Sequence, residues 1–144
     1  MSDTGVRFDP GRCVKCRTCE LACKEVHDLE PGIWPIVIQE VWKGAYPDIC
    51  REFFPLVCRH CEDPACVQEC PTGAIVKREG DGIVVVDQEV CVGCGVCRDA
   101  CPYQVPQFDS RGVMHKCDFC VQRGEGPACA QHCPTDALSM SVHA

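Results

Sequence analysis

Residues 58–102 read CRHCEDPACVQECPTGAIVKREGDGIVVVDQEVCVGCGVCRDACP, and this stretch decides how the protein is organised. It contains two runs of four cysteines, each ending in C-x3-C-P, joined by a short apolar link. Three cysteines close together, followed by a fourth just before a proline, form a spacing that holds iron–sulfur clusters. Because two such runs stand in tandem, we predict that this stretch binds a pair of clusters.

The whole sequence repeats this arrangement of cysteines. Sixteen of its 17 cysteines fall into four groups of four; every group ends in C-x3-C, and proline follows the last three. The repeat concerns the ligand pattern more than the sequence around it. The groups are Cys13, Cys16, Cys19 and Cys23; Cys58, Cys61, Cys66 and Cys70; Cys91, Cys94, Cys97 and Cys101; and Cys117, Cys120, Cys129 and Cys133. We predict that all of these cysteines are metal ligands.

Each group predicts a loop followed by a short helix. Three cysteines on a tight loop can wrap one face of a cluster, and Gly93 and Gly95 suit a close approach because they have no Cβ. In the third group, a helix over 96–100 is expected to begin near the third cysteine and to stop before Pro102. The fourth thiolate then points away from its own loop, towards a neighbouring cluster.

Further elements are expected between the groups. A β-hairpin is predicted over 75–86, with its turn at residues 81–82, which are Asp-Gly. A second hairpin, with strands over 36–41 and 53–57, is expected to cover a cluster. A helix that starts in the first group is expected to end near Asp28.

The composition favours metal over disulfide bonds. Cysteine supplies 17 of the 144 residues, far above ordinary usage. The N-terminal sequence MSDTGVRFDP lacks the basic and apolar regions of an export signal, so we expect a cytoplasmic protein, in which disulfides are disfavoured. No apolar run approaches the length of a membrane span, and we expect no direct membrane span.

The protein is acidic and carries no recognisable catalytic motif. Its formal net charge is −7, and bound clusters with their thiolates would make it more acidic. This charge argues against nucleic acid and favours a partner protein with complementary basic residues, although solubility alone would also explain it. No Ser-His-Asp set, phosphate loop or dinucleotide fingerprint is present. We therefore expect no catalytic residues and a protein that is not itself an enzyme.

Several residues have alternative interpretations. Zinc sites typically use two C-x2-C pairs, whereas these groups are triplets plus a distal cysteine. The fourth group is the exception, because its eight-residue spacer between Cys120 and Cys129, taken alone, would suit a zinc knuckle. For Cys50, outside the groups, an ordinary buried or half-buried thiol is favoured over a redox or substitute-ligand role. His60 and His132 could tune a cluster by hydrogen bonding, but we expect loop residues that face solvent or cap sulfur.

From about Phe8 to Met140 the sequence resembles the four-cluster ferredoxin-like electron-transfer subunits of molybdenum and tungsten oxidoreductases. That family includes the iron–sulfur subunits of dimethyl sulfoxide reductase, polysulfide reductase and formate dehydrogenase type. The matching motifs are CVKCRTCELACKEVHDL (13–29), PLVCRHCEDPACVQECPTGAI (55–75), CVGCGVCRDACPYQVPQF (91–108) and KCDFCVQRGEGPACAQHCPTDAL (116–138). Without an export signal or a long C-terminal extension, the protein looks most like the small polyferredoxin subunit of tungsten aldehyde oxidoreductases.

The resemblance implies an α+β fold. Two bacterial-ferredoxin-like units would be related by pseudo-twofold symmetry, with short hairpins and short helices around the clusters. Residues 1–144 would form one compact polyferredoxin. Its outer half would comprise 1–30 and 110–144, its inner half 55–109, and a hairpin over 31–54 would be inserted.

The resemblance also implies that groups one and four share one half, and groups two and three the other. Four [4Fe–4S] clusters would be held by four sets of ligands. Set A is Cys13, Cys16, Cys19 and Cys133; set B is Cys117, Cys120, Cys129 and Cys23; set C is Cys58, Cys61, Cys66 and Cys101; set D is Cys91, Cys94, Cys97 and Cys70. Sequential pairing, one with two and three with four, is the alternative.

The implied function is electron transfer within a hetero-oligomer. The protein would relay electrons between a large molybdenum- or tungsten-pterin catalytic subunit, of aldehyde oxidoreductase or formate dehydrogenase type, and another redox subunit or carrier. A flavin subunit is one candidate for that second partner. A free polyferredoxin that serves several redox enzymes is the alternative function, and a structural zinc protein is the third.

Overall fold

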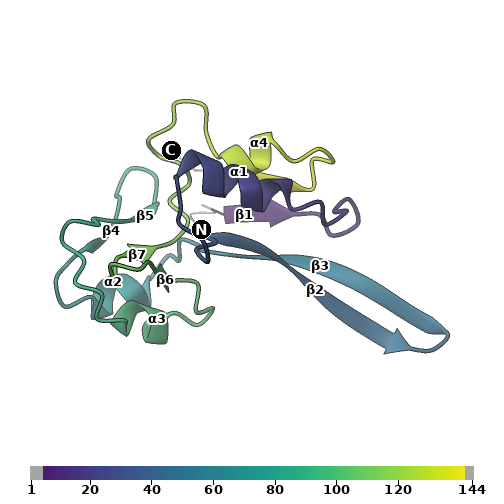
Figure 1. Ribbon diagram of the computed structural model, residues 1–144, viewed down its shortest axis with the longest axis horizontal. Coiled ribbons are helices and arrows are strands. Elements are labelled where there is room, and N and C mark those ends of the chain that lie inside the picture. Colours follow the sequence, from purple (N-terminus) through teal and green to yellow (C-terminus); the bar gives the residue numbers. More distant parts are fainter. Residues whose placement is uncertain (1–4, 142–144) are drawn as a thin grey trace.

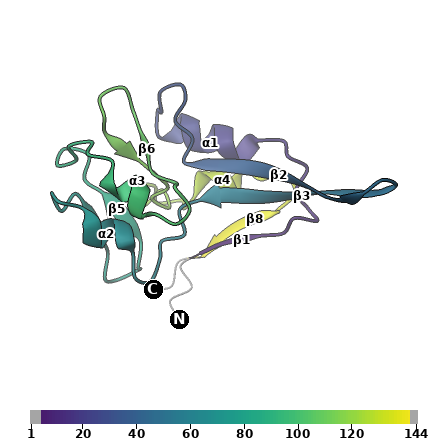
Figure 2. The ribbon, with the colours of Figure 1, turned by 90° about the horizontal axis from the view of Figure 1, so that it is seen from below.

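The computed structural model describes residues 5–141, which form short helices and hairpins (Figures 1 and 2). The ends of the expected outer half, 1–4 and 142–144, lie outside the described residues. The helices are α1 (Thr18–Val26), α2 (Ala65–Glu69), α3 (Val96–Ala100) and α4 (Ala128–Gln131). The strands are β1 (Gly5–Phe8), β2 (Ile36–Ala45), β3 (Asp48–Val57), β4 (Ile75–Lys77), β5 (Val84–Val86), β6 (Gln107–Phe108), β7 (Met114–His115) and β8 (Leu138–Ser141). This α+β arrangement is compatible with a ferredoxin-like iron–sulfur domain, while the pseudo-twofold symmetry stays a prediction.

One side of the molecule is built from both ends of the described residues. Strand β1 pairs antiparallel with β8, and Phe8 lies opposite Leu138. The ladder is extended by the Asp9 N–H, which donates to the Ala137 carbonyl at 2.8 Å. Helix α1 packs against α4 (Figure 1). The first and fourth cysteine groups therefore lie side by side although most of the sequence separates them.

The other side of the molecule is continuous in sequence. Helix α2 packs against α3, and β4 pairs antiparallel with β5. In the turn of that hairpin, Asp81 Oδ1 accepts the Ile83 N–H at 3.1 Å. Both the hairpin over 75–86 and the helix over 96–100 were predicted and are confirmed. A further small hairpin, β6–β7, precedes the fourth cysteine group and has no counterpart among the expected elements.

Strands β2 and β3 form an arm that projects from the body (Figures 1 and 2). All ten residues of each strand pair, from Ile36 opposite Val57 to Ala45 opposite Asp48. The two strands of the arm are therefore nearly twice as long as the strands expected from the sequence. The expected strands ended where the apolar pattern weakens.

Side-chain contacts across the arm stabilise its distal part. Lys43 Nζ lies 2.6 Å from Glu52 Oε2 on the opposite strand. The Arg51 guanidinium lies 5.6 Å from the centre of the Trp42 ring directly opposite it. Such cross-strand pairs stabilise a two-stranded ladder that no second layer covers.

The buried side chains form two small clusters, and cysteines belong to both. The outer cluster contains Cys19, Cys23, Ile36, Ile38, Phe53, Val57, Cys129 and Leu138. The inner cluster contains Ile75, Val84, Cys97 and Met114. The base of the arm thus covers the outer cysteine groups, and its distal part extends beyond them. Within the described residues, no helix is long and apolar enough to cross a membrane.

Candidate metal centres

The four cysteine groups begin with the same backbone turn. The residue two positions after the first cysteine is left-handed in every group: Lys15 (φ 54°), His60 (φ 46°), Gly93 (φ 72°) and Phe119 (φ 57°). Successive N–H groups in such a turn can converge on an anionic atom. The Lys15 N–H donates to Cys13 Sγ at 3.4 Å, and the His60 N–H donates to Cys58 Sγ at 3.5 Å. The loops are therefore shaped to stabilise thiolates.

Each group continues into a helix whose second residue is the third cysteine of the group. These residues are Cys19 in α1, Cys66 in α2, Cys97 in α3 and Cys129 in α4. Cys70 and Cys101 are the C-cap residues of α2 and α3, and a proline follows each of them, as the sequence predicted. Helix α1 continues beyond Cys23 because Lys24, rather than proline, follows it.

Two small cavities are each lined by all four cysteines of one expected set. Cys70, Cys91, Cys94 and Cys97, which are set D, line one of them. Cys13, Cys16, Cys19 and Cys133, which are set A, line the other, together with Phe8 and Ile38. In both cavities the fourth cysteine comes from a different group than the other three, which is the arrangement of two-cluster ferredoxins.

The cysteines of sets C and B are also neighbours. Burial raises the pKa of the Cys66 thiol, Lys116 opposes this effect, and three nearby thiolates raise it further. Those three are Cys58, Cys101 and Cys61, the remaining members of set C. In set B, burial raises the pKa of Cys23 to about 12, and the charges of Cys129 and Cys120 add to the effect.

The thiols are placed for metal ligation rather than for disulfide bonds. All 17 cysteines are free. Burial raises the pKa of Cys19 to about 12 and the pKa values of Cys97 and Cys129 to about 11. A buried thiolate with such a pKa needs a cation beside it, and a coordinated metal deprotonates its ligands.

The spacing of these sulfurs can be compared with the spacing that a single zinc ion requires. Zinc binds sulfur at about 2.3 Å, so four ligands around one ion lie within about 4 Å of one another. Among the described His, Cys, Asp and Glu side chains, the only group of three or more ligand atoms within 4.8 Å of one another is His27, Asp118 and Cys120. None of the four cysteine sets forms such a group among the described residues.

His60 provides a separate indication that a group with acceptor atoms belongs in the body. Its side chain is 3% exposed, and its Nδ1 accepts the Val84 N–H at 2.9 Å, so the neutral ring carries its proton on Nε2. That buried Nε2 has no hydrogen-bond partner among the described residues. Burial, reinforced by Lys116 and Lys77, lowers the pKa of His60 to about 2. Buried donors are rarely left unpaired, so this N–H is available to a group that carries acceptor atoms.

The expectations for the two loop histidines therefore have different outcomes. His60 was expected to face solvent or to cap sulfur. The solvent-facing alternative is wrong, because the loop of the second group folds inward beneath β5, whereas the His60 backbone N–H does cap Cys58 Sγ. His132 is exposed at the C-cap of α4, and its Nδ1 lies 2.9 Å from the carbonyl of Ala128, the first residue of that helix. Sequence spacing alone did not distinguish these two positions.

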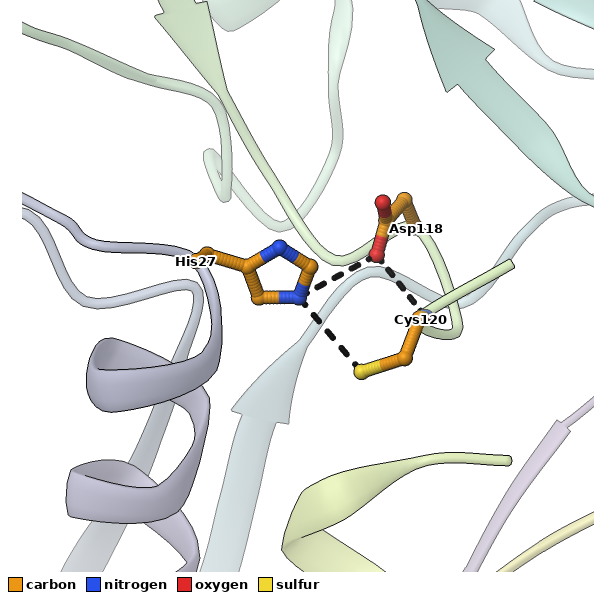
Figure 3. Close-up of side chains that lie close together, drawn as sticks. All are labelled: His27, Asp118 and Cys120. Carbon is orange, nitrogen blue, oxygen red and sulfur yellow. Dashed lines mark hydrogen bonds and ion pairs between the residues drawn. The ribbon is translucent and has the colours of Figure 1, made fainter. Parts of the chain in front are cut away.

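Sequence reasoning missed several side chains that touch cysteines of the candidate sites, among them Thr72, Thr135, Met140 and His27. His27 caps the end of α1, and its Nε2 lies 3.4 Å from Cys120 Sγ and 3.5 Å from Asp118 Oδ1 (Figure 3). The pKa of His27 is raised, mainly by the hydrogen bond to Cys120 and despite partial burial. Burial pushes the pKa of Cys120 upward, but hydrogen bonds from His27 and from the Ala128 N–H outweigh it and lower the pKa. No sequence pattern connects positions so far apart.

Cys50 does not belong to any of the candidate sites. It lies on the distal part of β3, opposite Lys43, and is exposed. The expectation of a buried or half-buried thiol is therefore wrong, because the two-stranded arm has no layer to cover it there (Figure 2). The ligand groups, by contrast, all lie in the body.

Comparison with known proteins connects the sequence to an iron–sulfur family. Residues 49–143 match the family model described as a 4Fe-4S dicluster domain. The sequence is 44% identical to the B subunit of anaerobic dimethyl sulfoxide reductase from Escherichia coli (strain K12), over 93% of this protein and 71% of that one. It is 40% identical to the corresponding subunit from Haemophilus influenzae, over 98% of this protein and 75% of that one. Identity to protein NrfC of Escherichia coli (strain K12) is 39%, over 94% of this protein and 65% of that one.

Proposed function

This protein belongs to the 4Fe-4S dicluster family that includes the B subunit of dimethyl sulfoxide reductase, and from this premise we propose that it is the electron-transfer subunit of an oxidoreductase complex. We assign it four [4Fe–4S] clusters, held by sets A to D. One observation carries the assignment: two cavities are each lined by four cysteines drawn from two different groups. The packing of α1 on α4 and of α2 on α3 supports the same pairing.

Electrostatic interactions between thiols of neighbouring sets support a linear relay in the order A, B, C, D. Beyond the larger effect of burial, a thiol in one set raises the pKa of a thiol in the next. The pairs are Cys129 on Cys19, Cys58 on Cys117, and Cys66 on Cys97. Cys16 of set A and Cys94 of set D are exposed, which places an accessible ligand at each end of the order. Electrons would enter at one of these ends and leave at the other.

The residues of the protein would hold and insulate the clusters. A bound [4Fe–4S] cluster supplies reversible one-electron transfer, with a potential set by hydrogen bonds, charge and burial. The sixteen group cysteines would be its ligands. Lys116 Nζ donates to the Val84 and Cys117 carbonyls and so ties the fourth cysteine group to the inner half. This tether would keep sets B and C next to each other.

The proposed partner is a molybdenum- or tungsten-pterin catalytic subunit, of aldehyde oxidoreductase or formate dehydrogenase type. The names of the relatives support a reductase assembly, and the cysteine-rich body offers ligands rather than a set of catalytic side chains. A flavin subunit or another carrier would exchange electrons at the opposite end of the relay. The complex would then be a hetero-oligomer.

Elemental analysis and ligand variants test the assignment of clusters. Four [4Fe–4S] clusters require about 16 iron atoms and as many acid-labile sulfides per protein molecule. Cys23→Ser and Cys117→Ser should disturb the same electron paramagnetic resonance (EPR) signal, because both residues are assigned to set B. Cys50→Ser is the matched control and should leave all signals unchanged. If Cys23→Ser instead disturbs a signal that a group-two variant also disturbs, nested pairing is wrong.

Isolation of the native complex tests the proposed partner. A tag on the protein should retain a larger subunit in fixed stoichiometry, and metal analysis of the complex should find molybdenum or tungsten besides iron. A fully loaded monomer without such a subunit would instead indicate a free polyferredoxin. Zinc without sulfide would reject both functions.

A further inference from the structure

His27 and the loop of the fourth cysteine group meet at the end of α1. The His27 ring extends from the C-cap of α1 towards Cys120, as Figure 3 shows. Its Nε2 lies 3.4 Å from Cys120 Sγ and 3.5 Å from Asp118 Oδ1. The contact joins the end of α1 to the fourth group through a side chain, whereas Cys13 and Cys58, the first cysteines of groups one and two, accept backbone N–H groups.

The direction of this hydrogen bond follows from its two neighbours. A cysteine that ligates iron is a thiolate and accepts hydrogen bonds, as does the Asp118 carboxylate. A ring nitrogen that faces two acceptors must carry the proton, so Nε2–H of His27 donates to Cys120 Sγ, with the Asp118 carboxylate beside it. Asp118 is itself held in place, because its Oδ1 accepts the Cys120 N–H at 2.8 Å. The carboxylate therefore fixes the ring in the orientation that reaches the sulfur.

We propose that His27 is a tuning residue of the relay: its Nε2–H donates to Cys120 Sγ and raises the reduction potential of the cluster that Cys120 binds. This inference rests on the proposed function, which assigns Cys120 to an iron–sulfur cluster. A donor to a ligand sulfur withdraws electron density from iron and favours the reduced, more negative cluster. The effect is confined to set B, the second position of the proposed relay. His27 thereby determines how readily that position accepts an electron from its neighbours.

Two substitutions separate hydrogen bonding from packing. His27→Leu removes the donor, whereas His27→Gln keeps an N–H donor at a similar distance from the backbone. Both proteins are purified anaerobically with their clusters, and iron and sulfide are measured first. EPR-monitored redox titration of His27→Leu should then show one cluster shifted to a more negative midpoint potential and the others unchanged. His27→Gln should restore the potential towards that of the unaltered protein.

A second measurement uses the unaltered protein. Protein labelled with 15N-histidine is reduced with its clusters in place, and pulsed EPR should detect a 15N coupling that disappears in His27→Gln. This comparison tests the hydrogen bond from His27 to the cluster ligand even if His27→Leu fails to bind its clusters. Full iron loading with unchanged potentials in His27→Leu, or the same 15N coupling in His27→Gln, would overturn the inference. Absence of iron and sulfide from the unaltered protein would instead refute the proposed function itself.

Discussion

Gly93 allows a close contact between two cysteine groups, and its replacement provides a sharp test of the structure. A Cβ built on Gly93 would lie 2.3 Å from the Gly112 carbonyl oxygen and 3.1 Å from its carbon. These are backbone atoms, so no flexible side chain can move aside. Gly112 lies in the turn between β6 and β7, which leads directly to Cys117. The clash would therefore move the loop that leads into the fourth cysteine group.

Gly95 is the matched control, four residues after Cys91 in the same loop. Both glycines are left-handed, with φ 72° at Gly93 and 80° at Gly95, so alanine costs about 1–2 kcal/mol at either position. A Cβ on Gly95 meets no described atom within 4 Å. Gly93→Ala adds an overpacking cost of about 1–3 kcal/mol. The Gly93 variant should therefore lose about twice as much stability as the Gly95 variant.

The assay follows cluster absorbance during heating of anaerobic, fully loaded protein at one fixed scan rate. Cluster loss is irreversible, so the variants are compared at equal rates rather than through equilibrium constants. Gly93→Ala should lower the midpoint about twice as far as Gly95→Ala and should also disturb the signal assigned to set B. Equal midpoints for the two variants would refute the contact with Gly112.

Three further perturbations test other parts of the structure. Glu20 is buried and its Oε1 accepts the Ile38 N–H at 2.7 Å, so Glu20→Ala should cost about 1–3 kcal/mol in thermal melts and Glu20→Gln much less. Asp109→Ala removes the acceptor for the Arg111 and Val113 N–H groups and should cost a similar amount. His115 and the other donors hold the pKa of Asp109 well below its ordinary value. The stability that the Asp109 carboxylate contributes is therefore complete above about pH 4 and declines on further acidification. If the difference in melting temperature between Asp109→Ala and the unaltered protein were constant down to pH 2, this pH dependence would be wrong. Removal of iron by a chelator should abolish the circular dichroism signal of the helices and strands. An iron-free protein that stays folded would refute the coupling of metal binding to folding.

The sequence could predict the features that depend on local spacing. The cysteine triplets and their prolines predicted loops, short helices and the helix over 96–100, because covalent spacing and proline geometry act within a few residues. The hairpin over 75–86 was predictable for the same reason, since Asp-Gly supports a tight turn. The four cysteine sets came from a family resemblance rather than from local rules, and the nested pairing remains a proposal.

Other features depend on contacts that no local rule contains. Lys15, His60 and Phe119 adopt left-handed conformations that sequence reasoning would reserve for glycine, because the loop as a whole imposes them. The contact between His27 and Cys120 requires α1 to pack beside the fourth group, and it spans 93 positions. The full length of the arm was also missed, since its distal strands are stabilised by pairs across the ladder rather than by burial.

The small size of the core explains why the cysteine sets must also stabilise the fold. The inner cluster of buried residues has four members, one of which is Cys97, and the outer cluster includes Cys19, Cys23 and Cys129. The same side chains would thus be both core residues and ligands. Their raised pKa values mean that, without metal, they would be neutral thiols around small cavities, held together by little apolar area. If the proposed relay is correct, the relay and the core would be one structure, and each cluster would add stability at the position where it transfers electrons.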